Sequence, residues 1–258
     1  MDSAVRERLL PGRVRDLLLL QVAPGRTAVI GCDSCGGIGP KPRDAVRVPA
    51  YTVARFTARV ALMEVAASGA TPAALVSTLC SEPDPVGLEV ARGIADELAE
   101  AGLDRTVAVT GSSEKNVPTE QTGLGVTVIG FANEAELRFG RSLAGDHVVC
   151  VGVPKVGPEV FLGDPDIADL PLLWRLLKMR EVHEVVPAGS RGVIHEAREL
   201  AASGGFSLEL CSPPGIDLRK SAGPATCLVV TIEPGTIAGH GAVAKLSGRP
   251  LYHVGCLR

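Results

Sequence analysis

Three polar clusters in the first half of the sequence have residue types that can carry chemistry. The first is Asp33, which ends the apolar run 26–33 and is followed by a Gly- and Pro-rich stretch with Lys41 and Arg43. A carboxylate at a strand end, followed by free amides and cations, suits a metal–phosphate group, because the carboxylate holds Mg²⁺ while amides and cations hold phosphate oxygens. A turn with a capping Asp explains the same pattern equally well.

The second cluster centres on Glu64, within the segment ALMEVAASGATP. An acidic residue among Ala, Leu, Met and Val is unfavourable to bury unless it is paired or bound to a metal, whereas on a solvent-facing side of a helix it needs no partner. The third cluster is TGSSEKNVPT at 110–119, which interrupts two apolar strands. A polar loop held on rigid strands suits a binding site, but a plain solvated connection has the same composition.

Other chemistries find less support in the sequence. Lys41 is followed by Pro42 rather than a hydroxyl residue, so the stretch is not a Walker A loop, and no dinucleotide-binding Gly pattern or Gly-x-Ser-x-Gly elbow occurs. Cys32 and Cys35 form a CxxC that suggests a redox dithiol or half of a zinc site. No second CxxC accompanies it, and the odd total of seven cysteines favours reduced thiols.

The clusters need a framework of strands and helices, and both kinds of pattern alternate along the chain. We predict a cytoplasmic amphipathic helix over 1–20 and two α/β (α+β) domains, 1–140 and 141–258. The first domain is predicted to contain strands at 26–33, 74–80, 106–110 and 125–131, helices at 51–68 and 86–101, and a polar loop at 111–121. The second is predicted to contain a loop and strand within 143–154, strands at 182–186, 206–210, 227–232 and 250–254, and helices at 170–179, 190–202 and 237–246.

Composition limits the partners. The net charge of −3 and the 3% of aromatic residues give neither a basic patch nor stacking platforms, so we expect no nucleic-acid partner. The longest apolar run near the start, Leu17 to Leu20, is far too short to span a bilayer, so we expect no membrane partner. We expect a small-molecule substrate and a cytoplasmic location instead.

Taken in order, the motifs resemble the superfamily of aminoimidazole ribonucleotide (AIR) synthetase, thiamine-monophosphate kinase, selenophosphate synthetase and the hydrogenase maturation dehydratase. The resemblance rests on VIGCD, MEVAASGATP, the loop 110–113, GVTVIG, LAGDHVVCVGVPKVG, AGSRGVIHEARELAASGG and SAGPATCLVVTIEP. It implies a two-domain AIR synthase-like fold, ATP and Mg²⁺ as cofactors in the first domain, and a homodimer.

The resemblance also implies roles for individual residues. Asp33 and Glu64 would hold the metal, and Asp33 and Glu114 would be the catalytic carboxylates. Contacts to ATP would come from Lys41, Thr110, Gly111, Ser112, Ser113 and Asn116. In such a mechanism the protein supplies positioning and charge neutralisation.

Two departures and one detailed likeness refine this expectation. Glu64 replaces the usual Asp, and Ser112 stands at a usual acidic position, so the metal loses a ligand or takes Glu114 instead. The sequence of residues 110–130 resembles that of small α-ribazole kinases. This resemblance predicts that the protein phosphorylates α-ribazole during salvage of the cobalamin lower ligand. The alternatives are an ATP-binding relative without turnover, another acceptor such as thiamine monophosphate, and a thiol or metal protein built on Cys32 and Cys35.

Overall fold

The computed structural model describes residues 12–235 and 242–258 and divides into two compact units, one ending at Leu137 and the other beginning at Arg138. The division lies inside the charged stretch 133–141, near the expected boundary at 140. Within the described ranges, the helices are too short or too polar to cross a membrane.

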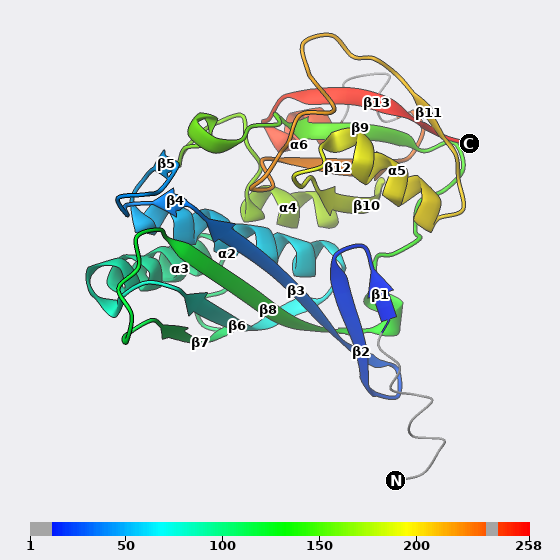
Figure 1. Cartoon of the computed structure of the whole chain (residues 1–258). Helices are drawn as coiled ribbons and strands as arrows, with labels where there is room; N and C mark the ends of the chain where they lie inside the picture. Colours follow the sequence, from blue (N-terminus) through cyan, green and yellow to red (C-terminus); the bar gives the residue numbers. More distant parts are fainter. Residues whose placement is uncertain (1–11, 236–241) are drawn as a thin grey trace. The chain divides into compact units, whose positions relative to one another are not determined.

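The first unit is built on a six-stranded sheet with two helices on one face (Figure 1). In spatial order the strands are β1 (Gly12–Val14), β2 (Leu17–Ala23), β3 (Arg26–Gly36), β8 (Gly123–Asn133), β6 (Thr71–Leu79) and β7 (Ala108–Ser113). A separate parallel pair, β4 (Ile38–Gly39) and β5 (Val46–Arg47), follows β3. Strand β8 runs antiparallel to both β3 and β6, and β7 is parallel to β6. Strands β3, β6 and β7 therefore end at the same edge.

Helices α2 (Ala50–Ala67) and α3 (Leu88–Glu100) pack against each other, and α2 also contacts β3 and β8. A π-helical turn, Pro83–Gly87, leads into α3. The helix pair is joined by the buried carboxylate of Glu97, which accepts hydrogen bonds from Arg55 at 2.6 Å and from Arg59 at 2.7 and 3.1 Å. Such charge-assisted bonds fix the register of one helix on the other.

The predicted helix at the start of the chain is wrong where it can be compared. Residues 1–11 lie outside the described residues, and the four leucines from Leu17 belong to β2, which pairs with β3. A short apolar run fits a strand as well as a helix, and strand pairing decides between them here. The strands and helices predicted from residue 26 to 131 are confirmed, with ends displaced by a few residues.

The second unit contains a fully antiparallel five-stranded sheet. Its spatial order is β10 (Val182–Pro187), β12 (Cys227–Ile232), β9 (His147–Gly152), β13 (Leu251–Leu257) and β11 (Leu208–Leu210). Helix α5 (Val193–Ser203) packs on an apolar core shared with β9, β10 and β12. Helix α4 (Leu170–Leu177) contacts β10 and α6 (Ala242–Ser247). Part of the helix predicted at 237–246 lies outside the described residues. The mixed α/β fold class is confirmed.

Candidate functional site

The edge at which β3, β6 and β7 end gathers the loops that follow these strands. The amide of Gly37 donates to the Thr122 carbonyl at 2.9 Å, and the amide of Arg43 donates to the Glu120 carbonyl at 3.0 Å. The amide of Glu114 donates to the carbonyl of Ser81 at 3.1 Å. Three loops distant in sequence thus form one polar surface, as expected where strands of an open sheet end together.

Asp33 lies on the helix-covered face of β3. Its register partner is Val126, which is buried, and Gly31, two residues earlier on the same face, lies against α2. Burial raises the pKa of Asp33 from 3.8 to about 6, and a hydrogen bond with the backbone of Ser34 opposes this only in part. The strand was expected to end at Asp33 but continues to Gly36, because its pairing with β8 extends that far.

Among the described neighbours of Asp33, no cation offsets the charge of its carboxylate. Burial and the charges of Asp33 and Asp44 raise the pKa of the Cys35 thiol to about 11. Among the residues that the structure describes, no ion pair to Asp33 is found. A desolvated carboxylate beside other acidic groups is a place where a bound cation is electrostatically favoured.

Glu64 lies on the side of α2 that faces the sheet. A β-carbon built on Gly31 would lie 3.5 Å from Glu64 Cβ, so the base of this side chain adjoins β3 at Gly31, two residues before Asp33. The side chain is half-buried and is engaged by neighbouring groups. The solvent-facing alternative for Glu64 therefore does not describe its position.

Lys41 is already engaged within the loop edge. Its ammonium group forms an ion pair with Glu82, and its amide donates to Asp44 Oδ2 at 2.8 Å. Buried Asp44 also accepts from the amide and the hydroxyl of Thr122, both at 2.8 Å. Glu82 and Asp44 were not predicted. The polar run SEPDP, which begins one residue after the end of β6, is the sequence signal that would have indicated Glu82.

Residues 110–113 belong to β7 rather than to a loop, so the polar loop predicted at 111–121 begins at Glu114. Together with α3 and the end of β6 they line a pocket of about 620 Å³. The predicted ATP contacts that border this pocket are Thr110, Gly111, Ser112 and Ser113, and Lys115 borders it too. This volume is in the range of small-molecule sites.

Asp33 and this pocket lie on one row across the sheet. Asp33 is in register with Val126, Val126 with Ser77, and Ser77 with Gly111. Three inter-strand spacings separate the ends of the row by ~14 Å. One metal ion cannot contact both ends, since Mg²⁺–oxygen distances are about 2 Å. If both ends act together, they contact different parts of an extended ligand.

Glu114 and Asn116 are joined in a tight turn. The Glu114 carboxylate accepts from the amides of Asn116 at 2.6 Å and Val117 at 3.2 Å. These bonds lower the pKa of Glu114. The carboxylate is therefore a weak proton acceptor, and its geometry suits orientation of a hydroxyl group better than removal of its proton.

The thiol or metal hypothesis for the CxxC is wrong in this structure. Cys32 and Cys35 are three residues apart on a regular strand, so their side chains point to opposite faces of the sheet. Cys32 is exposed, and Cys35 pairs with buried Leu124 on the helix side. Two thiols separated by a sheet cannot share a zinc ion or form a disulfide.

Residues 15–132 match the family model described as AIR synthase related protein, N-terminal domain. No curated protein matches the chain. A similar solved structure is thiamine-monophosphate kinase from Stenotrophomonas maltophilia K279a, with a TM-score of 0.63 and 17% identity over 99% of this chain and 90% of that chain. AaThiL complexed with AMPPCP and TMP has a TM-score of 0.64 and 14% identity over 99% of this chain and 88% of that chain. HypE from E. coli has a TM-score of 0.61 and 19% identity over 88% of this chain and 79% of that chain.

At these identities the solved structures establish a shared fold, and the family model supplies the sequence evidence for the first unit. The match begins in the turn before β2 and ends within β8, so it contains Asp33, Glu64 and the β7 residues. The chain therefore has the AIR synthase-like fold, and its residues 15–132, a little under half of its length, match the AIR synthase-related N-terminal domain.

Proposed function

We propose that the first unit binds ATP with Mg²⁺ and that the protein transfers the terminal phosphate to a hydroxyl group of a small molecule. The observation that carries this proposal is the row from Asp33 to Gly111, which joins a desolvated carboxylate to a ligand-sized pocket. The match of residues 15–132 to the AIR synthase-related N-terminal domain supports it, as does the similar fold of a thiamine-monophosphate kinase and of AaThiL solved with AMPPCP.

The residues present fit a magnesium ion. Carboxylate oxygens are ligands that Mg²⁺ prefers, and a cation would offset the desolvation that raises the pKa of Asp33. Asp33 and Glu64 would hold the ion, which would neutralise charge on the phosphate oxygens. The hydroxyl groups of Ser112 and Ser113 and the amide of Gly111 would contact the nucleotide from the other end of the row.

We propose α-ribazole as the acceptor, on the likeness of 110–130 to α-ribazole kinases. Its ribose 5′-hydroxyl oxygen would bond to the γ-phosphorus while the bond from that phosphorus to the β,γ-bridging oxygen breaks, leaving ADP. The hydroxyl proton would pass to solvent or to the product phosphate. Glu114 would orient the hydroxyl, in keeping with its lowered pKa.

A second candidate function is ATP binding without turnover. Ser112 stands where relatives carry an acid, and the carboxylate of Glu114, two residues further along the chain, accepts hydrogen bonds from two backbone amides. A missing metal ligand weakens catalysis more than binding, because the transition state carries the charge that the ion must neutralise. Thiamine monophosphate is the other acceptor to test.

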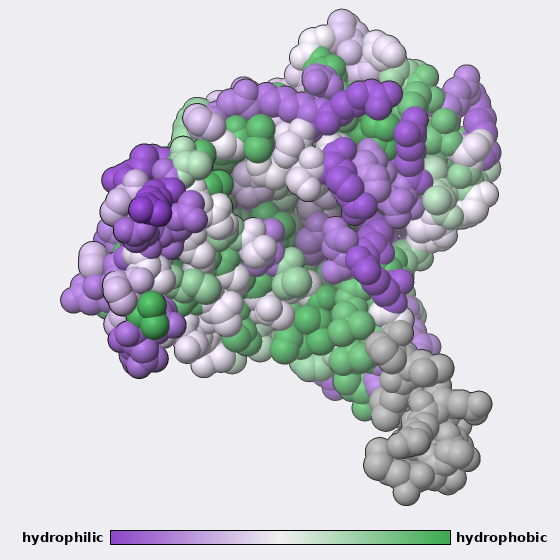
Figure 2. Space-filling view, viewed as in Figure 1, coloured by the Kyte–Doolittle hydropathy of each residue, from purple (hydrophilic) through white to green (hydrophobic). Residues whose placement is uncertain are grey.

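We also propose that the protein acts as a homodimer through the face of the first sheet opposite α2 and α3. Figure 2 shows hydrophobic surface over β2, β3 and β8. Leu18 is 39% exposed there, and Ile30 and Phe131 are half-buried on the same face. Apolar residues on an open sheet face favour association with a second copy.

The test is mass-spectrometric detection of product from Mg-ATP with α-ribazole, thiamine monophosphate or no acceptor. α-Ribazole phosphate that disappears in Asp33→Ala, but persists in the control Asp16→Ala on an exposed turn, is the expected result. Tight ATP binding with no product from either acceptor would favour the binding protein. Absence of ATP binding would overturn both functions.

A further inference from the structure

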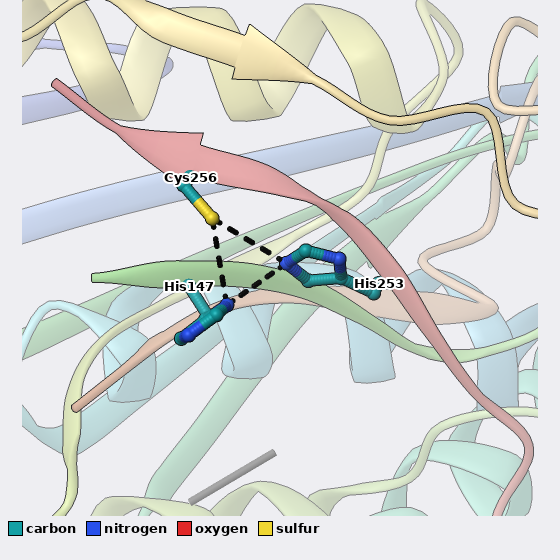
Figure 3. Close-up of side chains that lie close together, drawn as sticks. All are labelled: His147, His253 and Cys256. Atoms are coloured by element: carbon teal, nitrogen blue, oxygen red, sulfur yellow. Dashed lines mark hydrogen bonds between the residues drawn. The ribbon is translucent and has the colours of Figure 1, made fainter. Parts of the chain in front are cut away.

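The second unit brings together three side chains that are known as metal ligands: His147 on β9 and His253 and Cys256 on β13 (Figure 3). His147 Nδ1 lies 2.9 Å from His253 Nε2, and Cys256 Sγ lies 3.5 Å from the first nitrogen and 3.7 Å from the second. All three residues are half-buried. Their potential ligand atoms point into one small space between the two strands.

The register of β13 on β9 explains the convergence. Cys256 pairs directly with His147, and His253 pairs with Val149, two residues further along the same face of β9. In a regular strand, residues three apart point to opposite faces, but a bulge between His253 and Gly255 inserts one residue and returns both side chains to one face.

The bulge depends on a glycine. A β-carbon on Gly255 would lie 2.2 Å from the backbone oxygen of Glu209 on β11, so a larger residue would separate β13 from β11. Val254, on the opposite face, is fully buried in the core under α5. The backbone that aligns His253 with Cys256 is thus held from both sides.

The spacing of the three atoms matches a tetrahedral ion. With Zn–N bonds of about 2.05 Å and a Zn–S bond of about 2.3 Å, tetrahedral angles place two nitrogens about 3.3 Å apart and a nitrogen and sulfur about 3.6 Å apart. The two sulfur–nitrogen distances here are 3.5 and 3.7 Å. The nitrogen–nitrogen distance of 2.9 Å is that of a hydrogen bond, and the two imidazole rings need to separate only slightly to reach the tetrahedral distance.

We propose that His147, His253 and Cys256 form a binding site for a zinc-class divalent ion. Two imidazoles and one thiolate are a donor set that zinc accepts and that Mg²⁺ and Ca²⁺ do not favour. The group has these three members among the residues the structure describes, so a tetrahedral ion takes its fourth ligand from water or a bound molecule. Binding releases the Cys256 thiol proton to solvent and replaces the contact between the two rings.

The outer contacts agree with this assignment. The His253 ring hydrogen-bonds to the backbone of Gly255, a contact of the kind that orients ligating imidazoles. The neighbouring carboxylate of Glu209 is held by Arg258 at 2.7 Å. The ion would join β9 to β13, and would therefore stabilise the second unit independently of catalysis.

The first experiment uses the full chain, freed of metal by a chelator, and titrates it with Zn²⁺ by calorimetry and with Co²⁺ by absorption spectroscopy. We expect one ion per chain and a Co²⁺ spectrum with a thiolate charge-transfer band and tetrahedral d–d bands. Cys256→Ser should abolish the charge-transfer band, and His253→Gln should weaken binding by at least roughly tenfold. The controls Cys80→Ser and His195→Gln, outside the group, should bind as the natural chain does.

A second measurement needs no variant. Zn²⁺ should slow alkylation of Cys256 in the natural chain, read by mass spectrometry of its peptide, while exposed Cys80 is alkylated at an unchanged rate. Cys256 alkylated equally fast with and without Zn²⁺, or a charge-transfer band that survives in Cys256→Ser, would overturn the site. Neither readout depends on phosphate transfer.

Discussion

Replacing Asp33 by Asn should stabilise the protein in the absence of a cation. Burial raises the pKa of this carboxyl from 3.8 to about 6. Each unit by which the pKa of the carboxyl differs between the folded and unfolded states corresponds to about 1.4 kcal/mol. The ionised carboxylate therefore destabilises the folded unit by at most about 3 kcal/mol at neutral pH. Partial access of solvent reduces this to about 1–3 kcal/mol. Asn keeps the shape and remains neutral, so the variant should gain that amount.

The gain should depend on pH in a defined direction. Because the folded pKa of Asp33 is raised, its favourable contribution is fully present below about pH 3.8 and is lost as the pH rises through about 6. Urea unfolding followed by circular dichroism should therefore show little difference between variant and natural chain at about pH 4, and the full difference at about pH 7.5.

Asp44→Asn is the matched control, because its carboxylate is buried but satisfied by hydrogen bonds from Lys41 and Thr122. This variant should be less stable by about 1–3 kcal/mol. Adding Mg²⁺ with AMPPCP should stabilise the natural chain and not Asp33→Asn, since linkage requires the ligand to bind the folded state. An Asp33→Asn variant no more stable than the natural chain at about pH 7.5 would refute the desolvation argument.

Three further predictions concern the first unit. Glu97→Ala leaves two buried arginines of α2 without their shared carboxylate. This variant should lower the free energy of unfolding, measured in urea, by about 3–5 kcal/mol. The control Glu100→Ala removes a more exposed carboxylate and should lower it by less than about 1 kcal/mol. Equal effects would contradict a buried network. Gly39→Ala, at φ 151° and with its β-carbon 2.3 Å from a hydroxyl oxygen, should lower thermal stability by about 1–3 kcal/mol, whereas Gly36→Ala meets nothing within 4 Å and should be neutral. Ala91→Trp fills the pocket from the exposed side of α3 and should weaken AMPPCP binding in calorimetry at least roughly tenfold, and unchanged affinity would place the nucleotide elsewhere.

The sequence predicted those parts of the fold that depend on local pattern. The Ala- and Val-rich run at 51–68 and the apolar run at 125–131 form α2 and β8 because their periodicities are unambiguous. Gly69, with φ 89°, follows α2 as the helix-ending residue that its position suggested. The β–α–β order of the first unit followed directly.

Features that depend on pairing between distant segments could not be predicted. The four leucines from Leu17 became a strand because β3 offers hydrogen-bonding partners, and the pairing of β3 with β8 carried the strand past Asp33. Glu64 was predicted as a site residue, but only the packing of α2 on β3 shows which way it faces. His147 and His253 lie far apart in sequence, and only the register of β13, including its bulge, brings them together.

The strand order of the second sheet has a consequence for how the protein is made. β13 comes last in sequence among the five strands but lies between β9 and β11, and β11 has β13 as its pairing partner in the described sheet. During synthesis, residues 208–210 therefore cannot pair with the sheet until residues 251–257 have left the ribosome. The first unit ends at Leu137, so its whole sequence leaves the ribosome while the rest is still being translated. Nascent chains arrested before β13 should therefore expose the edge of β9 to chaperones.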